Sequence, residues 1–82
     1  MRRGRFEIIG EILSLATDNV KKTSIVYRAN LNFNLVNKYL NLLIQEGLIS
    51  STVGSTRNFK TTEKGLEFLK AYKNMKTMAK NL

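Results

Sequence analysis

Apolar residues recur every three to four positions in several segments of the chain and alternate with polar residues in two short runs. The first pattern is typical of helices with one buried face, and the second is typical of strands. The sequence predicts helices over about 5–17, 23–29 and 33–46, two strands at about 48–53 and 57–61, and a last helix that Thr62 caps and that ends near residue 82. The fold class is therefore mainly α with a small β-hairpin.

The break between the second and third predicted helices is very short, Asn30-Leu31-Asn32. Two helices joined by so short a turn cross at a steep angle, as in a helix-turn-helix. Asn32 is a good N-cap for the third helix, Gly47 is the expected residue after its end, and Thr23 or a neighbour is expected to cap the second helix. With the hairpin added, the prediction is a winged helix-turn-helix domain over 1–61 and a long C-terminal helix over 62–82.

The third helix separates its apolar residues from its polar ones. The stripe predicted to face the core consists of Phe33, Val36, Leu40, Leu43 and Ile44. The remaining arc, roughly 100° wide, is the polar strip, which consists of Asn34, Asn37, Lys38, Asn41 and Gln45. A solvated helix face ordinarily mixes glutamates with lysines, whereas this strip contains no acid. Asparagine and glutamine pair with adenine in the major groove, and lysine reaches guanine or phosphate, so the strip is predicted to contact double-stranded DNA.

Other basic and short polar residues, outside the third helix, are also predicted to contact DNA. Arg28, at the end of the second helix, is expected to touch the DNA backbone. The hairpin offers Ser55, Thr56, Arg57, Asn58 and Lys60, which suit phosphate or minor-groove contact, although an exposed turn has a similar composition. The N-terminal residues Arg2, Arg3 and Arg5 resemble a minor-groove arm or, equally, a disordered terminus.

The last helix carries a seam of apolar residues spaced alternately four and three apart. Its members are Phe68, Tyr72, Met75, Ala79 and Leu82. This spacing is that of a coiled coil and predicts a homodimer through the C-terminal helix. Leu66 and Leu69 lie off the seam and are expected to pack on the domain core. The alternative is that the helix folds back on the first helix of its own chain, whose apolar arc, beginning at Phe6, is too wide for one neighbour to cover.

The amino-acid composition limits the catalytic and metal-binding chemistry that the protein can perform. The chain has no histidine and no cysteine, which removes the usual general base, the commonest metal ligands and any disulfide framework. The 6 acidic residues form no recognisable acid–base pair. We therefore predict no enzymatic activity, cofactor, metal or small-molecule ligand. The formal net charge of +8 attracts polyanions, first nucleic acid and second an anionic membrane surface.

The position of the charges supports the first of these partners. Glu7, Glu11 and Asp18 belong to the first helix or its end, which leaves another side of the domain basic. Glu7 and Glu11 also interrupt the apolar run that a signal peptide needs. No stretch reaches the roughly 18 apolar residues of a membrane span. We expect a cytoplasmic, nucleoid-associated protein that does not bind membranes.

Two other functions stay open at this point. The same polar strip suits a winged-helix module that docks on another protein. The apolar seam of the last helix, flanked by lysines, is also compatible with a helix that lies on anionic lipid.

Two stretches of the chain carry a resemblance to a known family. One runs from Lys22 to Asn32 and continues through Tyr39-Leu40 and Leu43 to Gly47-Leu48-Ile49, and the other is Thr61-Thr62-Glu63-Lys64-Gly65-Leu66. On these residues the chain, of 9.4 kDa, resembles the small archaeal winged helix-turn-helix proteins that are chromatin-associated or regulatory, including those that viruses or plasmids encode. The resemblance implies double-stranded DNA binding and a dimer formed by antiparallel C-terminal helices. It places DNA contacts on Asn34, Asn37, Lys38, Asn41 and Arg57.

Overall fold

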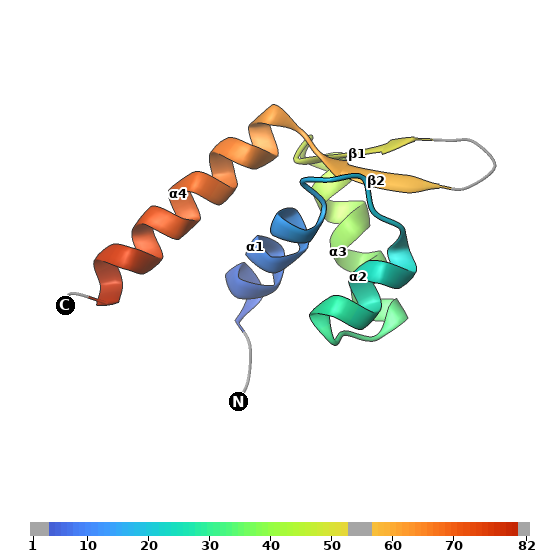
Figure 1. Cartoon of the computed structure of the whole chain (residues 1–82), viewed down its shortest axis with the longest axis horizontal. Helices are drawn as coiled ribbons and strands as arrows, with labels where there is room; N and C mark the ends of the chain where they lie inside the picture. The colour runs from blue at the N-terminus through green and yellow to red at the C-terminus, as the bar shows by residue number, and fades with distance from the viewer. Residues whose placement is uncertain (1–3, 53–56, 81–82) are drawn as a thin grey trace.

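The computed structural model describes residues 4–52 and 57–80. Its elements follow one another as α1 (Arg5–Leu15), α2 (Lys22–Ala29), α3 (Phe33–Gln45), β1 (Ile49–Thr52), β2 (Asn58–Thr61) and α4 (Glu63–Lys80). In Figure 1 the hairpin projects to one side of α1, α2 and α3, and α4 runs down the other side, next to α1. The predicted order of elements and the predicted fold class are confirmed.

Helix α1 lies at the centre of the domain because its apolar residues cover two of its sides. Ile12 and Leu13 are fully buried in the core that α1 shares with α2, α3 and the hairpin. The other side of α1 faces α4. Phe6, at the start of the predicted apolar arc, is 58% exposed, because the first turn of α1 extends beyond the core.

The turn between α2 and α3 is held by backbone and side-chain hydrogen bonds. Asn30 adopts a left-handed conformation, φ 54°, and the Leu31 amide donates to the Val26 carbonyl over 3.0 Å. The Asn32 side chain accepts from the Leu35 amide over 2.7 Å, so the predicted cap of α3 is confirmed. The expected cap of α2 is wrong: Lys21 holds that position, and within the described part of the chain no side-chain hydrogen bond caps α2.

The hairpin is tied to the helices at its base. Strands β1 and β2 pair antiparallel with Ile49 opposite Thr61 and Ser51 opposite Phe59, and these residues share the inner face. The Thr61 hydroxyl donates to the Leu13 carbonyl over 2.7 Å. Val20, in the loop after α1, exchanges two backbone hydrogen bonds with Phe59, of 2.8 and 3.0 Å. These bonds orient the hairpin relative to α1.

Thr62 joins the end of α3 to the start of α4. Its hydroxyl donates to the Gly47 carbonyl over 2.6 Å and accepts from the Gly65 amide over 3.1 Å, so it caps α4 as predicted. Gly47 has φ 76°, which glycine adopts readily and which suits the predicted residue after a helix end. Gly65 lies so close to the backbone of Leu48 that a side chain there would collide with its carbonyl.

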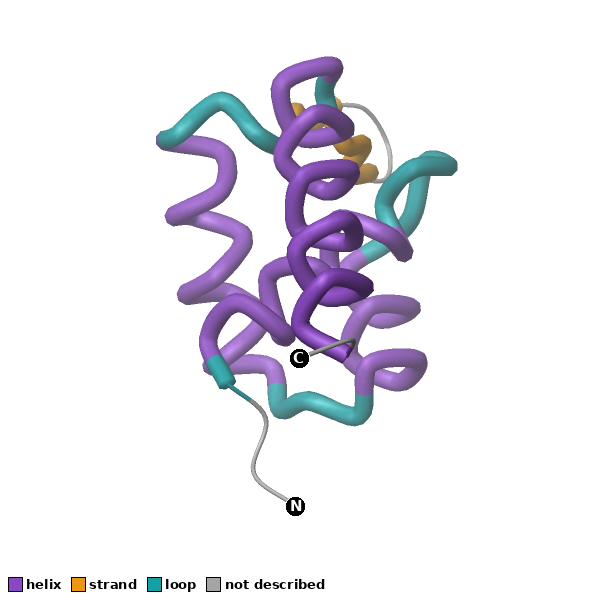
Figure 2. Tube along the Cα trace, turned by 90° about the vertical axis from the view of Figure 1, so that its left-hand side faces the viewer, coloured by secondary structure: helices purple, strands orange, loops and turns teal. Residues whose placement is uncertain are grey.

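Helix α4 packs on α1 through its first half, and its second half runs alongside the start of α1 with its side chains exposed. In Figure 2, which is turned to bring this side forward, α4 lies nearest the viewer. Leu69 is buried in the core, as expected, and Phe68 is partly buried against it. Leu66 was also expected to pack on the core, but it is 45% exposed, because α4 turns that side to solvent.

Candidate nucleic-acid interface

Helix α3 presents the polar strip on its outer surface. Val36, Tyr39, Leu40 and Leu43 are buried on its inner side. Of the strip, Asn37 is half-buried, and the exposed members are Asn34, Lys38, Asn41 and Gln45. The protomer therefore leaves amides and a lysine open to a partner along one side of α3.

Phe33 extends this outer surface at the start of the helix. It was expected in the core stripe, but it is 46% exposed. The first buried residue of α3 is Val36, almost one turn later, so the core ends before it reaches Phe33. Because residues four apart share a helix face, Phe33 borders the strip one turn before Asn37.

Arg5 joins the strip from another element. A shallow cleft of about 340 Å³ separates the start of α1 from α3, and it is lined by Arg5, Lys38, Tyr39, Asn41, Leu42 and Gln45. Arg5 is the first residue of α1 and therefore does not belong to a free arm; Arg2 and Arg3 lie outside the described residues. Two cations beside amide groups suit an anionic group such as a phosphate. The sequence placed Arg5 at the start of α1, but no pattern in it indicated that α3 lies alongside.

The hairpin does not bring its two described cations to one face. The Arg57 Nε donates to the Ser51 Oγ over 2.8 Å, and its guanidinium lies 5.2 Å from the centre of the Phe59 ring. Lys60 is exposed and follows the buried Phe59, so it points to the opposite face of the strand. The predicted contacts Ser55 and Thr56 lie outside the described residues. Arg28 is exposed in the last turn of α2.

The acidic residues of α1 face away from this surface. Glu7 and Glu11 line a cleft between α1 and α4 together with Lys73 and Lys76. In Figure 1, α3 and α4 lie on opposite sides of α1. The carboxylates of α1 are thus on the α4 side, and the strip retains its positive character. Within residues 4–52 and 57–80, no three acidic side chains gather into a metal site.

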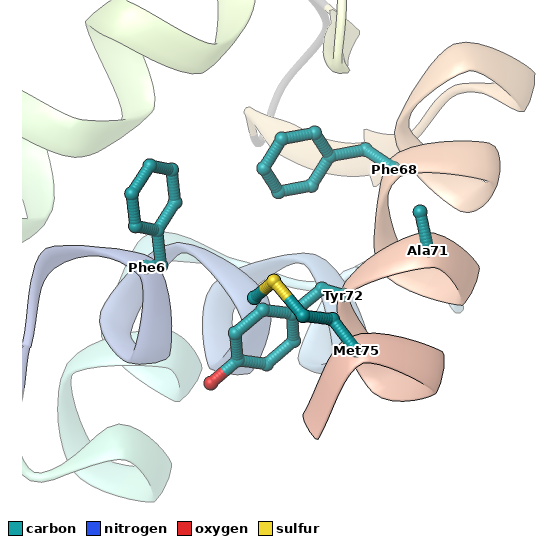
Figure 3. A pocket seen from close by; sticks show the side chains of 5 residues that line it. All are labelled: Phe6, Phe68, Ala71, Tyr72 and Met75. Atoms are coloured by element: carbon teal, nitrogen blue, oxygen red, sulfur yellow. The ribbon is translucent and has the colours of Figure 1, made fainter. Parts of the chain in front are cut away.

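The predicted dimer seam divides into two halves. Tyr72 packs on Gly10 of α1, so this half of α4 folds back on its own chain, which was the alternative drawn from the sequence. Beyond it Met75 is 58% exposed and Ala79 is exposed, and Leu82 lies outside the described residues. Figure 3 shows an apolar groove of about 260 Å³ between the two helices, lined by Phe6, Phe68, Ala71, Tyr72 and Met75.

The helix-turn-helix and the hairpin agree with a comparison to known families, in which a family model described as winged helix-turn-helix matches residues 2–80. The chain belongs to the winged helix-turn-helix family. Over 65 residues this winged-helix chain is 37% identical to an uncharacterized protein, MJ0287, of Methanocaldococcus jannaschii; the match covers 78% of the chain and 64% of that relative. The chain thus spans somewhat less than two thirds of the relative's length. No segment of the described residues is at once helical, long enough and apolar enough to span a bilayer.

Solved structures share the fold. The structure of Sso10a-2, a DNA-binding protein from Sulfolobus solfataricus, superposes with a TM-score of 0.89 at 25% identity, covering 96% of this chain and 84% of that one. A mutant of the Lactococcus lactis protein ZitR, solved in complex with DNA, superposes with a TM-score of 0.74 at 22% identity, over 90% of this chain and 56% of that one. MepR, a transcription regulator of Staphylococcus aureus, superposes with a TM-score of 0.75 at 19% identity, over 92% of this chain and 64% of that one.

Proposed function

We propose that this protein binds double-stranded DNA as a homodimer and acts as a transcription regulator or an architectural DNA-binding protein. The observation that carries the proposal is the polar strip of α3, which is free of acid and faces outward from a helix-turn-helix. A helix about 10–12 Å across fits the major groove of B-DNA. The function is recognition of DNA, with no catalytic step and no cofactor.

The residues divide by the part of DNA that they reach. In the major groove, the amides Asn34, Asn37 and Asn41 meet base edges, with Gln45 toward the far end of the helix. Lys38 and Arg5 share a cleft and hold one phosphate between them. Arg28 and the hairpin contact the backbone on either side, the hairpin through Ser55, Thr56, Arg57 and Lys60.

The homodimer rests on the exposed half of α4. Met75 and Ala79 continue the seam alongside the first turn of α1, where they line a cleft with Phe6. Both stay exposed, and they leave apolar surface that a second copy of α4 covers. In this arrangement residues 62–82 act as the dimerisation helix of the 1–61 domain. A two-fold dimer sets its half-sites about 34–36 Å apart, or at multiples of that distance.

Two solved structures with the same fold support this proposal: Sso10a-2 is a DNA-binding protein, and a mutant of ZitR was solved in complex with DNA. The net charge of +8 agrees with a nucleic-acid partner. A protein with this function resides with the nucleoid in the cytoplasm.

The experiment is a titration of a fluorescent duplex of mixed sequence, about 30 base pairs long so that both half-sites fit, at several salt concentrations. With about six phosphates neutralised per dimer, affinity falls about a thousandfold between roughly 50 and 200 mM salt. Binding weaker than micromolar without a salt slope contradicts the proposal. A protein partner contacted through the strip would then be the remaining function for the same surface.

A further inference from the structure

We propose that Phe33 reads thymine, by packing its ring on the C5 methyl group in the major groove. This inference rests on the proposed DNA binding and deepens it, because it names the base pair that the start of α3 prefers. The structure places an apolar ring, 46% exposed, at the first residue of α3 and at the border of the polar strip. The N-terminal residues of a recognition helix are those that meet base edges.

Phe33 differs from the other exposed apolar side chains in the described part of the chain. Phe6, Leu66, Met75 and Met78 belong to α1 and α4, away from the strip. Tyr27, on α2, is exposed as well, but its hydroxyl gives it a polar end. Phe33 alone among them is wholly apolar and lies on α3.

The amide side chains next to Phe33 suit the adenine of the A·T pair whose thymine Phe33 contacts. Asn37 lies one turn later on the same face, and Asn34 follows Phe33 directly. An A·T pair offers adenine N6 and N7 to an amide, and the thymine methyl is the apolar group in the major groove. Amides beside an aromatic ring therefore suit A·T pairs better than G·C pairs.

The start of α3 is also held in place before DNA arrives. The Asn32 side chain caps the helix over 2.7 Å, and the Leu31 amide bonds to Val26. These bonds fix the backbone on both sides of Phe33, so its ring reaches the groove from a defined position.

The test is a thermodynamic cycle between the ring and the methyl group. Two fluorescent alternating duplexes of equal length serve as probes, one of adenine and thymine and one in which deoxyuridine replaces thymidine and so lacks the methyl. Wild type is expected to bind the thymine duplex more tightly, by about fourfold for each methyl contacted. Phe33→Ala is expected to lose this preference, and Phe33→Leu to keep part of it.

The matched control is Leu66→Ala, since Leu66 is 45% exposed and lies on α4; it is expected to keep the full thymine preference. Circular dichroism confirms that each variant is folded. Salt-dependent binding of both duplexes with equal affinity by wild type overturns the thymine contact and leaves the proposed DNA binding intact. A preference that Phe33→Ala retains also overturns it, because the methyl then acts through DNA shape. Failure to bind either duplex contradicts the proposed function itself.

Discussion

Tyr72 of α4 lies so close to Gly10 of α1 that a Cβ atom at position 10 would stand 2.7 Å from its ring. The glycine lets the two helices approach and lets the ring cover α1. This contact joins the C-terminal helix to the domain.

Gly10→Ala tests the contact. Alanine favours a helix interior by about 1 kcal/mol over glycine, whereas overpacking costs about 1–3 kcal/mol. We expect a net loss of about 1 kcal/mol in the free energy of urea unfolding at fixed protein concentration. In a Tyr72→Ala background the same change is expected to stabilise the protein, because the ring is gone. Stabilisation in both backgrounds would show that Tyr72 does not pack on α1.

Gly65→Ala is expected to destabilise the protein more than Gly10→Ala does. A Cβ there collides with the Leu48 carbonyl, which already accepts from the Thr62 amide over 3.0 Å, and it would lie 2.6 Å from a methyl carbon of Thr61. Because backbone is harder to displace than a side chain, we expect a loss of more than about 2 kcal/mol in thermal or urea unfolding. Gly4→Ala is the control, since no described atom lies within 4 Å of its Cβ position. Equal stability of the two variants would contradict the close packing of α4 on the end of α3.

The Asn32 cap fixes where the polar strip begins. Asn32→Ala is expected to cost about 1 kcal/mol of unfolding free energy, because the Leu35 amide loses its partner. Asn32→Ser is expected to restore most of this stability, since serine caps helices nearly as well. If alanine and serine gave the same unfolding midpoint, the hydrogen bond would contribute nothing to the turn.

The sequence predicted the helices, the hairpin and the caps at Asn32 and Thr62 because these depend on neighbours along the chain. Spacing identified the inner side of α3 in the same way. Predictions that depended on segments distant in the sequence were less accurate. Phe33, Phe6 and Leu66 fit apolar stripes on a helical wheel, but a wheel does not show where the covering element ends.

The relation between α1 and α4 shows the same limit. The wide apolar arc of α1 indicated a second neighbour, and the spacing from Phe68 onward indicated a coiled-coil seam. The second neighbour of α1 is confirmed, because Tyr72 of α4 covers it. The coiled-coil seam stays a prediction, and Met75 is exposed. Which residues of the seam α1 covers depends on the path of α4, which the spacing alone does not give. The proximity of Arg5 to Lys38 likewise depends on tertiary packing.

Met75→Glu tests the proposed dimer. Met75 is 58% exposed and is the first residue of the seam in the exposed half of α4. A charged side chain without a partner in a dimer interface is costly. We expect wild type to sediment as a dimer and Met75→Glu as a folded monomer with weaker DNA binding. Thr77→Glu is the control on the opposite side of α4 and is expected to remain dimeric. A monomeric wild type, or a Met75→Glu variant that stays dimeric, contradicts an interface through this part of the helix.

The most direct test of the account compares DNA binding by two double variants with the same change in charge. Lys38→Glu with Asn41→Glu alters the polar strip, and Lys70→Glu with Asn74→Glu makes the same substitutions on exposed positions of α4. The measurement is the affinity for a mixed-sequence duplex over a range of salt concentrations. The strip variant is expected to lose at least about a hundredfold in affinity and to have a shallower salt slope, whereas the α4 variant is expected to stay within about tenfold of wild type. Equal losses in the two variants would show that DNA responds only to net charge and would contradict a recognition surface on α3.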